Sequence, residues 1–162
     1  MLKSDRRKSY NSLKNVFVMY FVLLVSAIMS VYLKIPESKD IILKVATQSI
    51  YIFLIVVMSI HIEITILYLV LKIIGIKGLQ YKKITQLLSG TAYYAYSLLT
   101  LLVVLISPIL AKQTIEMITM LIEIIKITIS YFIIKNTYNM GRTRQIIIIM
   151  VFLLFAVLYL IM

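Results

Sequence analysis

The stretch NVFVMYFVLLVSAIMSVYL at residues 15–33 decides the class of this fold, because none of its side chains is charged. As an α-helix rising about 1.5 Å per residue it would reach about 28 Å, close to the hydrocarbon thickness of a bilayer. We therefore predict a first membrane span here. The basic prefix at residues 1–14 resembles the start of a signal peptide, but the apolar run is too long and no small-residue cleavage site follows it. We expect a retained signal anchor with this prefix in the cytoplasm.

Apolar runs recur along the rest of the chain, at about residues 45–71, 84–111, 115–134 and 145–162. Short connections that contain Pro, Gly or basic residues separate them, which is where helices end. With 62% hydrophobic residues, the chain has too much apolar surface for a soluble domain. The predicted fold is an all-α polytopic transmembrane bundle of about five spans, in which residues 15–162 form a single transmembrane domain.

The basic residues predict the orientation of the spans, since Lys and Arg near span ends stay on the cytoplasmic side. With the N-terminus inside and the C-terminus outside, twelve Lys and Arg residues lie in cytoplasmic segments and four in external ones. Beyond the prefix, the cytoplasmic set consists of Lys72, Lys77, Lys82, Lys83, Lys135, Arg142 and Arg144. We expect these side chains to contact a partner protein or anionic lipid, the latter at roughly 1 kcal/mol each. The net charge of +11 is then explained without nucleic acid.

The polar residues of the fourth span form one stripe. They are spaced three or four residues apart, which places them on one side of a helix, and they are Glu116, Thr119, Glu123, Lys126 and Ser130. Only Thr128 lies off this stripe. An unpaired charge in the middle of a span costs about 3 kcal/mol on insertion scales. Because Glu123 and Lys126 are three residues apart, we expect them to pair.

The third span has a matching polar stripe that includes Tyr93 and Tyr96, with the small residues Gly90 and Ser97 beside it. The two stripes are expected to face each other. The first and fifth spans have few polar atoms, so we place them at the lipid-facing rim. The predicted interior therefore contains the charges of the second and fourth spans and the tyrosine hydroxyls.

Two interpretations of the intramembrane charges stand. Glu63, Glu123 and Lys126 can form an ion or proton path or bind a partner, or they can form a satisfied pair that fixes helix register. His61 and Glu63 are two residues apart and point to opposite sides of the second span, so they do not form one site by themselves. A lone His in this setting is more often packed or hydrogen-bonded than a metal ligand. The tyrosines can line a pocket or hydrogen-bond within the bundle.

The residue inventory argues against an enzyme. The chain has one His and no Cys, which excludes thiol chemistry and leaves no set of ligands for a metal site. Asp5 and Asp40 both lie outside the predicted spans, which argues against intramembrane aspartyl catalysis. No glycine-rich phosphate-binding motif occurs. We therefore expect no metal and no cofactor.

Two stretches carry a family resemblance. Residues 68–105, YLVLKIIGIKGLQYKKITQLLSGTAYYAYSLLTLLVVL, resemble the Yip-type family of five-span membrane proteins, in which a span ends in a G-x-K-G-like turn before an aromatic and basic segment. Residues 124–154, IIKITISYFIIKNTYNMGRTRQIIIIMVFLL, are similar to that family's last two spans. The chain departs from the family pattern at Thr91-Ala92 and lacks a Pro within the third span before Pro108.

The resemblance implies a non-enzymatic accessory or scaffold protein, of the bacterial branch, in the cell membrane. Its bacterial relatives are thought to assist membrane complexes such as ABC exporters, so the partner would be another membrane protein or a second copy of this chain. Two alternatives come from other classes. One is a small-molecule transporter or substrate-binding subunit that uses the intramembrane Glu/Lys site, and the other is an immunity or resistance protein against a membrane-active peptide.

Overall fold

The computed structural model describes residues 2–34, 41–138 and 140–161, and the side chains of residues 14–34, 41–138, 140–155 and 157. Within these ranges the chain is helical and contains no strand. The elements in chain order are α1 (Leu2–Tyr32), α2 (Ile41–Ile73), α3 (Tyr81–Ser89), α4 (Ala92–Ile106), the 3-10 helix η1 (Ser107–Ile109), α5 (Lys112–Tyr138) and α6 (Arg142–Ile161). The predicted all-α class is confirmed.

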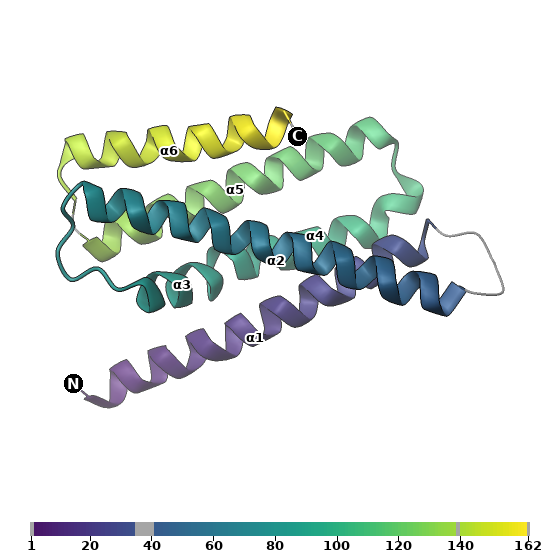
Figure 1. The fold of residues 1–162 in the computed structure, drawn as a ribbon, viewed down its shortest axis with the longest axis horizontal. Coiled ribbons are helices and arrows are strands. Elements are labelled where there is room, and N and C mark those ends of the chain that lie inside the picture. Colours follow the sequence, from purple (N-terminus) through teal and green to yellow (C-terminus); the bar gives the residue numbers. More distant parts are fainter. Residues whose placement is uncertain (1, 35–40, 139, 162) are drawn as a thin grey trace.

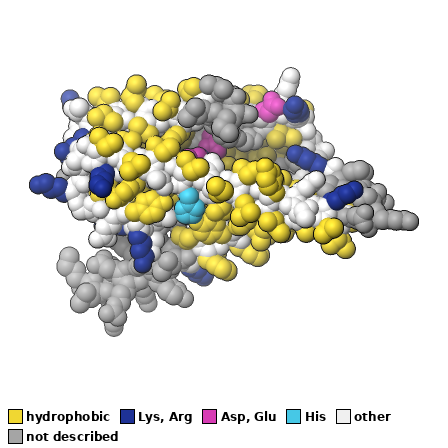
Figure 2. Space-filling view, viewed as in Figure 1, with side chains coloured by type: hydrophobic (Ala, Val, Ile, Leu, Met, Phe, Trp, Pro, Cys, Tyr) yellow, Lys and Arg dark blue, Asp and Glu magenta, His cyan; other side chains and the backbone are white. Residues whose placement is uncertain are grey.

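The helices run back and forth along one long axis (Figure 1). Four stretches are long and apolar enough to cross a membrane, namely Lys14–Tyr32, Ile41–Ile73, Tyr81–Ile109 and Lys112–Tyr138. Apolar side chains cover much of the middle of the visible surface, and Lys and Arg gather toward its two ends (Figure 2). Such an exposed apolar belt is what lipid-facing helices require.

The last helix, α6, lies at the edge of the bundle beside α5 (Figure 1) and also contacts α2. Its Ile148 and Phe152 are buried, whereas Ile146, Met150 and Leu153 are exposed. Its edge position agrees with the expected rim placement of the fifth apolar run. A fifth membrane span remains a prediction, because the candidate spans found among the described residues are the four above.

The third apolar run lies within one candidate span, Tyr81–Ile109, but it is not one continuous helix. It divides into α3 and α4 at Gly90 and Thr91, where Thr91 leaves helical geometry with φ −134° and ψ −75°. The Asn15 side-chain amide on α1 donates a hydrogen bond to the Gly90 carbonyl at 3.1 Å. This contact satisfies a backbone acceptor at the break, which would be costly to leave unpaired inside a membrane. The run ends in η1, whose first turn contains Pro108.

The turn after α2 explains why Gly is required there. Gly75 has φ +73°, its amide donates to the Lys72 carbonyl, and the Ile76 amide donates to the Leu71 carbonyl. These two bonds are the helix-ending pattern in which a left-handed residue, usually Gly, satisfies the last carbonyls. A Cβ at Gly75 would lie 3.9 Å from the guanidinium of Arg144, so this turn lies close to the start of α6.

The first helix runs along one edge of the bundle (Figure 1), where one of its faces is exposed, as the expected rim placement requires, and the other is buried; Phe17 and Phe21 on the exposed face are 74% and 59% exposed. α1 packs most extensively against α4 and α2, and Met19, Leu23 and Ala27 are at most 4% exposed. The hydrophobic core joins residues from α1 to α6 with Met140 of the α5–α6 connection: Met19, Leu23, Ile60, Ile64, Leu67, Leu71, Ile84, Leu88, Tyr93, Ile134, Met140, Ile148 and Phe152. The apolar composition of α1 did not identify which of its faces is buried, because protein-facing and lipid-facing residues are equally apolar in a membrane.

Candidate functional site

Three helices bring a charged cluster together inside the bundle. The Lys126 ammonium on α5 lies 2.6 Å from Glu123 Oε2 on the same helix. It also donates to both carboxylate oxygens of Glu63 on α2, at 3.1 and 3.2 Å. The Tyr93 hydroxyl on α4 donates to Glu63 Oε2 at 2.7 Å. We call Glu63, Tyr93, Glu123 and Lys126 the polar centre.

The polar centre is enclosed by protein. The side chains of Lys126 and Glu123 are 7% and 8% exposed, and that of Glu63 is 24% exposed. Two tyrosine rings cover the ammonium, with Nζ 5.5 Å from the centroid of Tyr93 and 5.0 Å from that of Tyr96. Aromatic faces attract cations more strongly where water is excluded. The arrangement therefore holds Lys126 as a cation between two carboxylates and two rings.

Helical spacing explains part of this geometry. Glu123 and Lys126 are three residues apart on α5, and Tyr93 and Tyr96 are three apart on α4, so each pair shares a helix face. The predicted Glu123–Lys126 pair is confirmed, and Thr128 is exposed, as its place off the stripe predicts. Along α5, Lys126 lies about 14 Å from Lys135 and about 21 Å from Lys112 at 1.5 Å per residue. The polar centre is thus deep in the bundle and nearer its basic end.

The charges of the polar centre do not balance. Its two carboxylates face one ammonium, and among the described residues no second Lys or Arg forms an ion pair with either carboxylate. Uncompensated charge inside a membrane protein costs several kcal/mol by order of magnitude. Neutrality in the membrane therefore requires one further positive charge, which a proton or a monovalent cation can supply.

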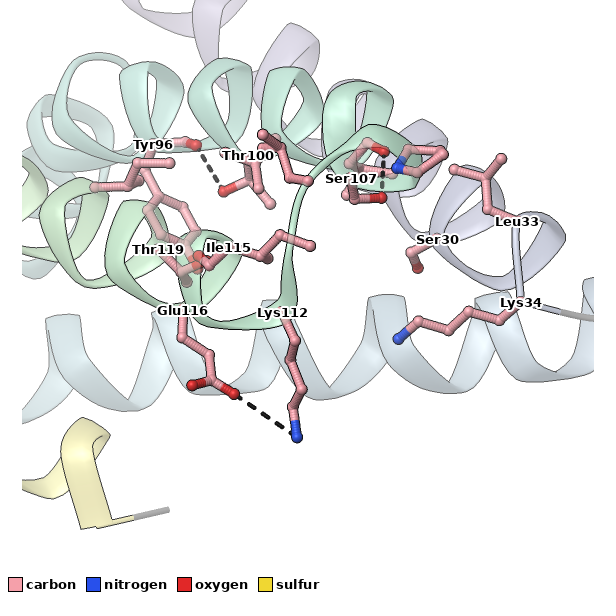
Figure 3. A pocket seen from close by; sticks show the side chains of 15 residues that line it. Ser30, Leu33, Lys34, Tyr96, Thr100, Ser107, Lys112, Ile115, Glu116 and Thr119 are labelled. Carbon is pink, nitrogen blue, oxygen red and sulfur yellow. Dashed lines mark hydrogen bonds and ion pairs between the residues drawn. The ribbon is translucent and has the colours of Figure 1, made fainter.

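A cavity of about 670 Å³ is lined from Lys112, at the end of α5 far from the basic residues, to Ile122 and Tyr96 next to the polar centre. We call it the vestibule, and it is lined by Ser30, Leu33, Lys34, Tyr96, Thr100, Val103, Val104, Ser107, Pro108, Leu110, Lys112, Ile115, Glu116, Thr119 and Ile122. Lys34, Lys112 and Glu116 lie at its outer end, and Tyr96 lies at its inner end (Figure 3). Since the ring of Tyr96 also covers Lys126, this side chain borders both the vestibule and the polar centre.

Two of the predicted intramembrane residues do not join the polar centre. His61 is hydrogen-bonded through Nε2 to the Tyr20 hydroxyl at 2.9 Å, and the two rings stack with centroids 6.3 Å apart. This matches the expectation that His61 and Glu63 point to opposite sides of the helix. Glu116, whose side chain is 56% exposed, lies 3.8 Å from the ammonium of Lys112. The polar stripe of α5 therefore passes from the mouth of the vestibule to the buried centre.

The basic residues predicted for the cytoplasmic loops gather at one end of the molecule. They lie in the α2–α3 connection or in the helix ends next to the α2–α3 and α5–α6 connections, at the same end as the N-terminus (Figure 1). Lys72, Lys77, Lys82, Lys83, Arg142 and Arg144 are exposed. Lys135 is half-buried, with its ammonium 5.9 Å from the ring centroid of Tyr131. We call these seven residues the basic end.

Several residues of this region could not be identified from the sequence. Tyr20 lies within the uncharged first span, and Ser30 and Lys34 belong to the vestibule only because α1 ends against α4 and η1. Their positions depend on contacts between distant helices. The described residues contain no group of three or more His, Asp or Glu side chains that could hold a metal ion.

Comparison with known proteins finds no matching family model, no similar curated protein and no similar solved structure. The resemblance to the Yip-type family therefore remains an expectation from the sequence.

Proposed function

We propose that this chain is a non-enzymatic, multi-pass transport protein of the bacterial cell membrane that takes up a proton or small monovalent cation at its polar centre. The observation that carries the proposal is the buried excess of one carboxylate over ammonium groups in the polar centre. An ionisable group inside a membrane span is costly, and such groups commonly serve ion or proton pathways. Here the excess charge creates a demand for one positive charge.

The position of the vestibule supports the same function. A transported ion needs a route from water to the buried site, and the vestibule extends from exposed residues at one end to Tyr96. The ring of Tyr96 then lies 5.0 Å from the Lys126 ammonium. Rotation of this one side chain would connect the vestibule to the polar centre, which would make Tyr96 a gate between them.

Replacing Glu123 with Gln is the direct test of this function. The amide keeps the size of the side chain and an acceptor for Lys126, but it leaves Glu63 and Lys126 as a neutral pair with no need for another cation. In proteoliposomes of the full chain, we expect wild type to dissipate an imposed proton, Na⁺ or K⁺ gradient. Glu123→Gln should fall to the rate of protein-free liposomes. A pH-sensitive dye inside the liposomes measures proton flux, and Na⁺- and K⁺-sensitive dyes measure the fluxes of the two metal ions separately.

Glu116→Gln is the matched control for this test, since it makes the same chemical change at an exposed carboxylate beside Lys112. We expect it to retain most of the wild-type flux. Equal flux from wild type and Glu123→Gln, or wild-type flux no faster than empty liposomes for every ion, would contradict the transport proposal. The charged cluster would then be a structural device that joins α2, α4 and α5.

We also propose five spans, with the N-terminus inside and the C-terminus outside. The common placement of the basic end and the N-terminus supports this topology. The chain has no Cys, so a single introduced Cys is an unambiguous reporter. In right-side-out vesicles, a membrane-impermeant maleimide should label Ala111→Cys, whereas Lys77→Cys should react only after permeabilisation. The reverse labelling pattern would show that the orientation is the opposite of the proposed one.

A second candidate function is the accessory or scaffold protein that the family resemblance implies. The observation that favours it is the convergence of the α2–α3 turn and the start of α6, where Gly75 and Arg144 lie close together. The two basic connections thus form one surface on which a partner protein can bind. A membrane protein that co-purifies stoichiometrically with wild type, but not with Lys82→Gln/Lys83→Gln, would favour this function over autonomous transport.

A further inference from the structure

The vestibule has the dimensions of a lipid chain site. Its lining comes from the end of α1, from α4 with η1 and from the first half of α5, and it includes Ser30 of α1 and Ile115 and Thr119 of α5. From Lys112 at its mouth to Ile122 at its inner end, α5 rises about 15 Å. This depth is about half of the roughly 30 Å hydrocarbon core of a bilayer. The cavity therefore spans one leaflet.

Most of the surface that lines the vestibule is apolar. Its walls are formed by Leu33, Val103, Val104, Leu110, Ile115 and Ile122. The hydroxyl hydrogens of four lining side chains are already donated to nearby backbone carbonyls at 2.8 to 2.9 Å, namely those of Ser30, Thr100, Ser107 and Thr119. These groups therefore offer acceptors but no free donors to the cavity. A buried water needs two to four polar partners. An acyl chain fills such a space with better contacts than water.

The mouth of the vestibule carries positive charge. Lys34 and Lys112 are exposed and extend from the same rim of the cavity (Figure 3). The carboxylate of Glu116 pairs with Lys112 at 3.8 Å. Lys34, Lys112 and Glu116 together therefore give the rim a net charge of +1. A lipid headgroup held here would lie at the membrane surface, where lysines attract anionic headgroups.

The geometry points to a phospholipid site: the vestibule binds one acyl chain of an anionic phospholipid, whose phosphate lies between Lys34 and Lys112. The chain end would lie against Tyr96, between external water and the polar centre. This site goes beyond the proposed ion uptake and does not depend on it, because lipid retention and ion flux are measured separately. If both functions hold, departure of the lipid would open the route to the polar centre.

Native mass spectrometry of the full chain, released from nanodiscs that contain equal phosphatidylglycerol and phosphatidylcholine of matched chains, tests the headgroup. We expect wild type to retain one phosphatidylglycerol. Lys34→Gln and Lys112→Gln should each weaken this preference about fivefold, equivalent to about 1 kcal/mol per lysine. Lys44→Gln, which removes an exposed lysine that does not line the vestibule, should leave the retained lipid unchanged.

Filling the cavity tests the acyl chain. Thr100→Phe and, independently, Val104→Phe place a ring in the vestibule while both lysines remain, and each should lose the bound lipid. Melting in nanodiscs identifies whichever variant stays folded. Three results would each overturn the site: equal retention of the two lipids by wild type, a loss in Lys44→Gln as large as that in Lys34→Gln or Lys112→Gln, or full retention by a folded cavity-filled variant.

Discussion

Replacing Lys126 with Met should lower the free energy of unfolding by about 3–5 kcal/mol, the usual cost of removing one partner from a buried ion pair. The substitution keeps an unbranched side chain of similar length but removes the ammonium that lies within 3.2 Å of both carboxylates. Glu63 and Glu123 would then be two unpaired acids inside the bundle. Thermal or denaturant unfolding in bicelles at neutral pH measures the effect.

Two further variants decide how the Lys126→Met result is interpreted. Lys112→Met makes the same change at a side chain that is 91% exposed, and it should cost less than about 0.5 kcal/mol. Adding Glu63→Gln and Glu123→Gln to Lys126→Met should recover much of the stability, because neutral amides remove the unpaired charges. A melting curve of Lys126→Met equal to wild type would mean that the polar centre is not held together by its charges.

Met19→Ala should be the most damaging truncation of an apolar side chain in α1. Met19 is 0% exposed and belongs to the hydrophobic core that joins α1 to the other helices. We expect a loss of about 2 kcal/mol, the lower end of the range for such truncations. The lower end applies because the lost contacts are exchanged for contacts with lipid rather than with water.

Met58→Ala is the matched control, since it removes the same side chain from a position on α2 that is 63% exposed. In a membrane this side chain faces lipid, so its truncation should change stability by less than about 0.5 kcal/mol. Unfolding of the two variants under identical conditions gives the comparison. Equal losses, or a larger loss for Met58→Ala, would mean that the buried face of α1 at Met19 does not stabilise the bundle.

The polar centre can stabilise the fold and also take up ions, and the proposed variants separate these roles. Lys126→Met tests whether the cluster stabilises the junction of α2, α4 and α5. Glu123→Gln leaves a neutral pair between Glu63 and Lys126, so it should preserve most of the stability while abolishing ion uptake. A purely structural cluster would show the first effect without the second.

The sequence by itself determined the features that depend on residues near one another in the chain. Long uncharged runs predicted the helices, and the spacing of Glu123 and Lys126 predicted their ion pair. The glycine at position 75 coincides with the end of α2, because only a residue that tolerates positive φ closes that turn without strain. These signals are local and follow from helix geometry.

Only the tertiary structure decided which surfaces of the helices meet. Glu63 pairs with a lysine 63 positions away, and α1 buries one face, with Met19 and Leu23, although its apolar sequence does not mark that face. The break at Gly90 and the vestibule likewise arise where distant helices pack. In lipid, protein-facing and membrane-facing side chains are both apolar, so hydropathy identifies a span but does not say which of its faces is buried.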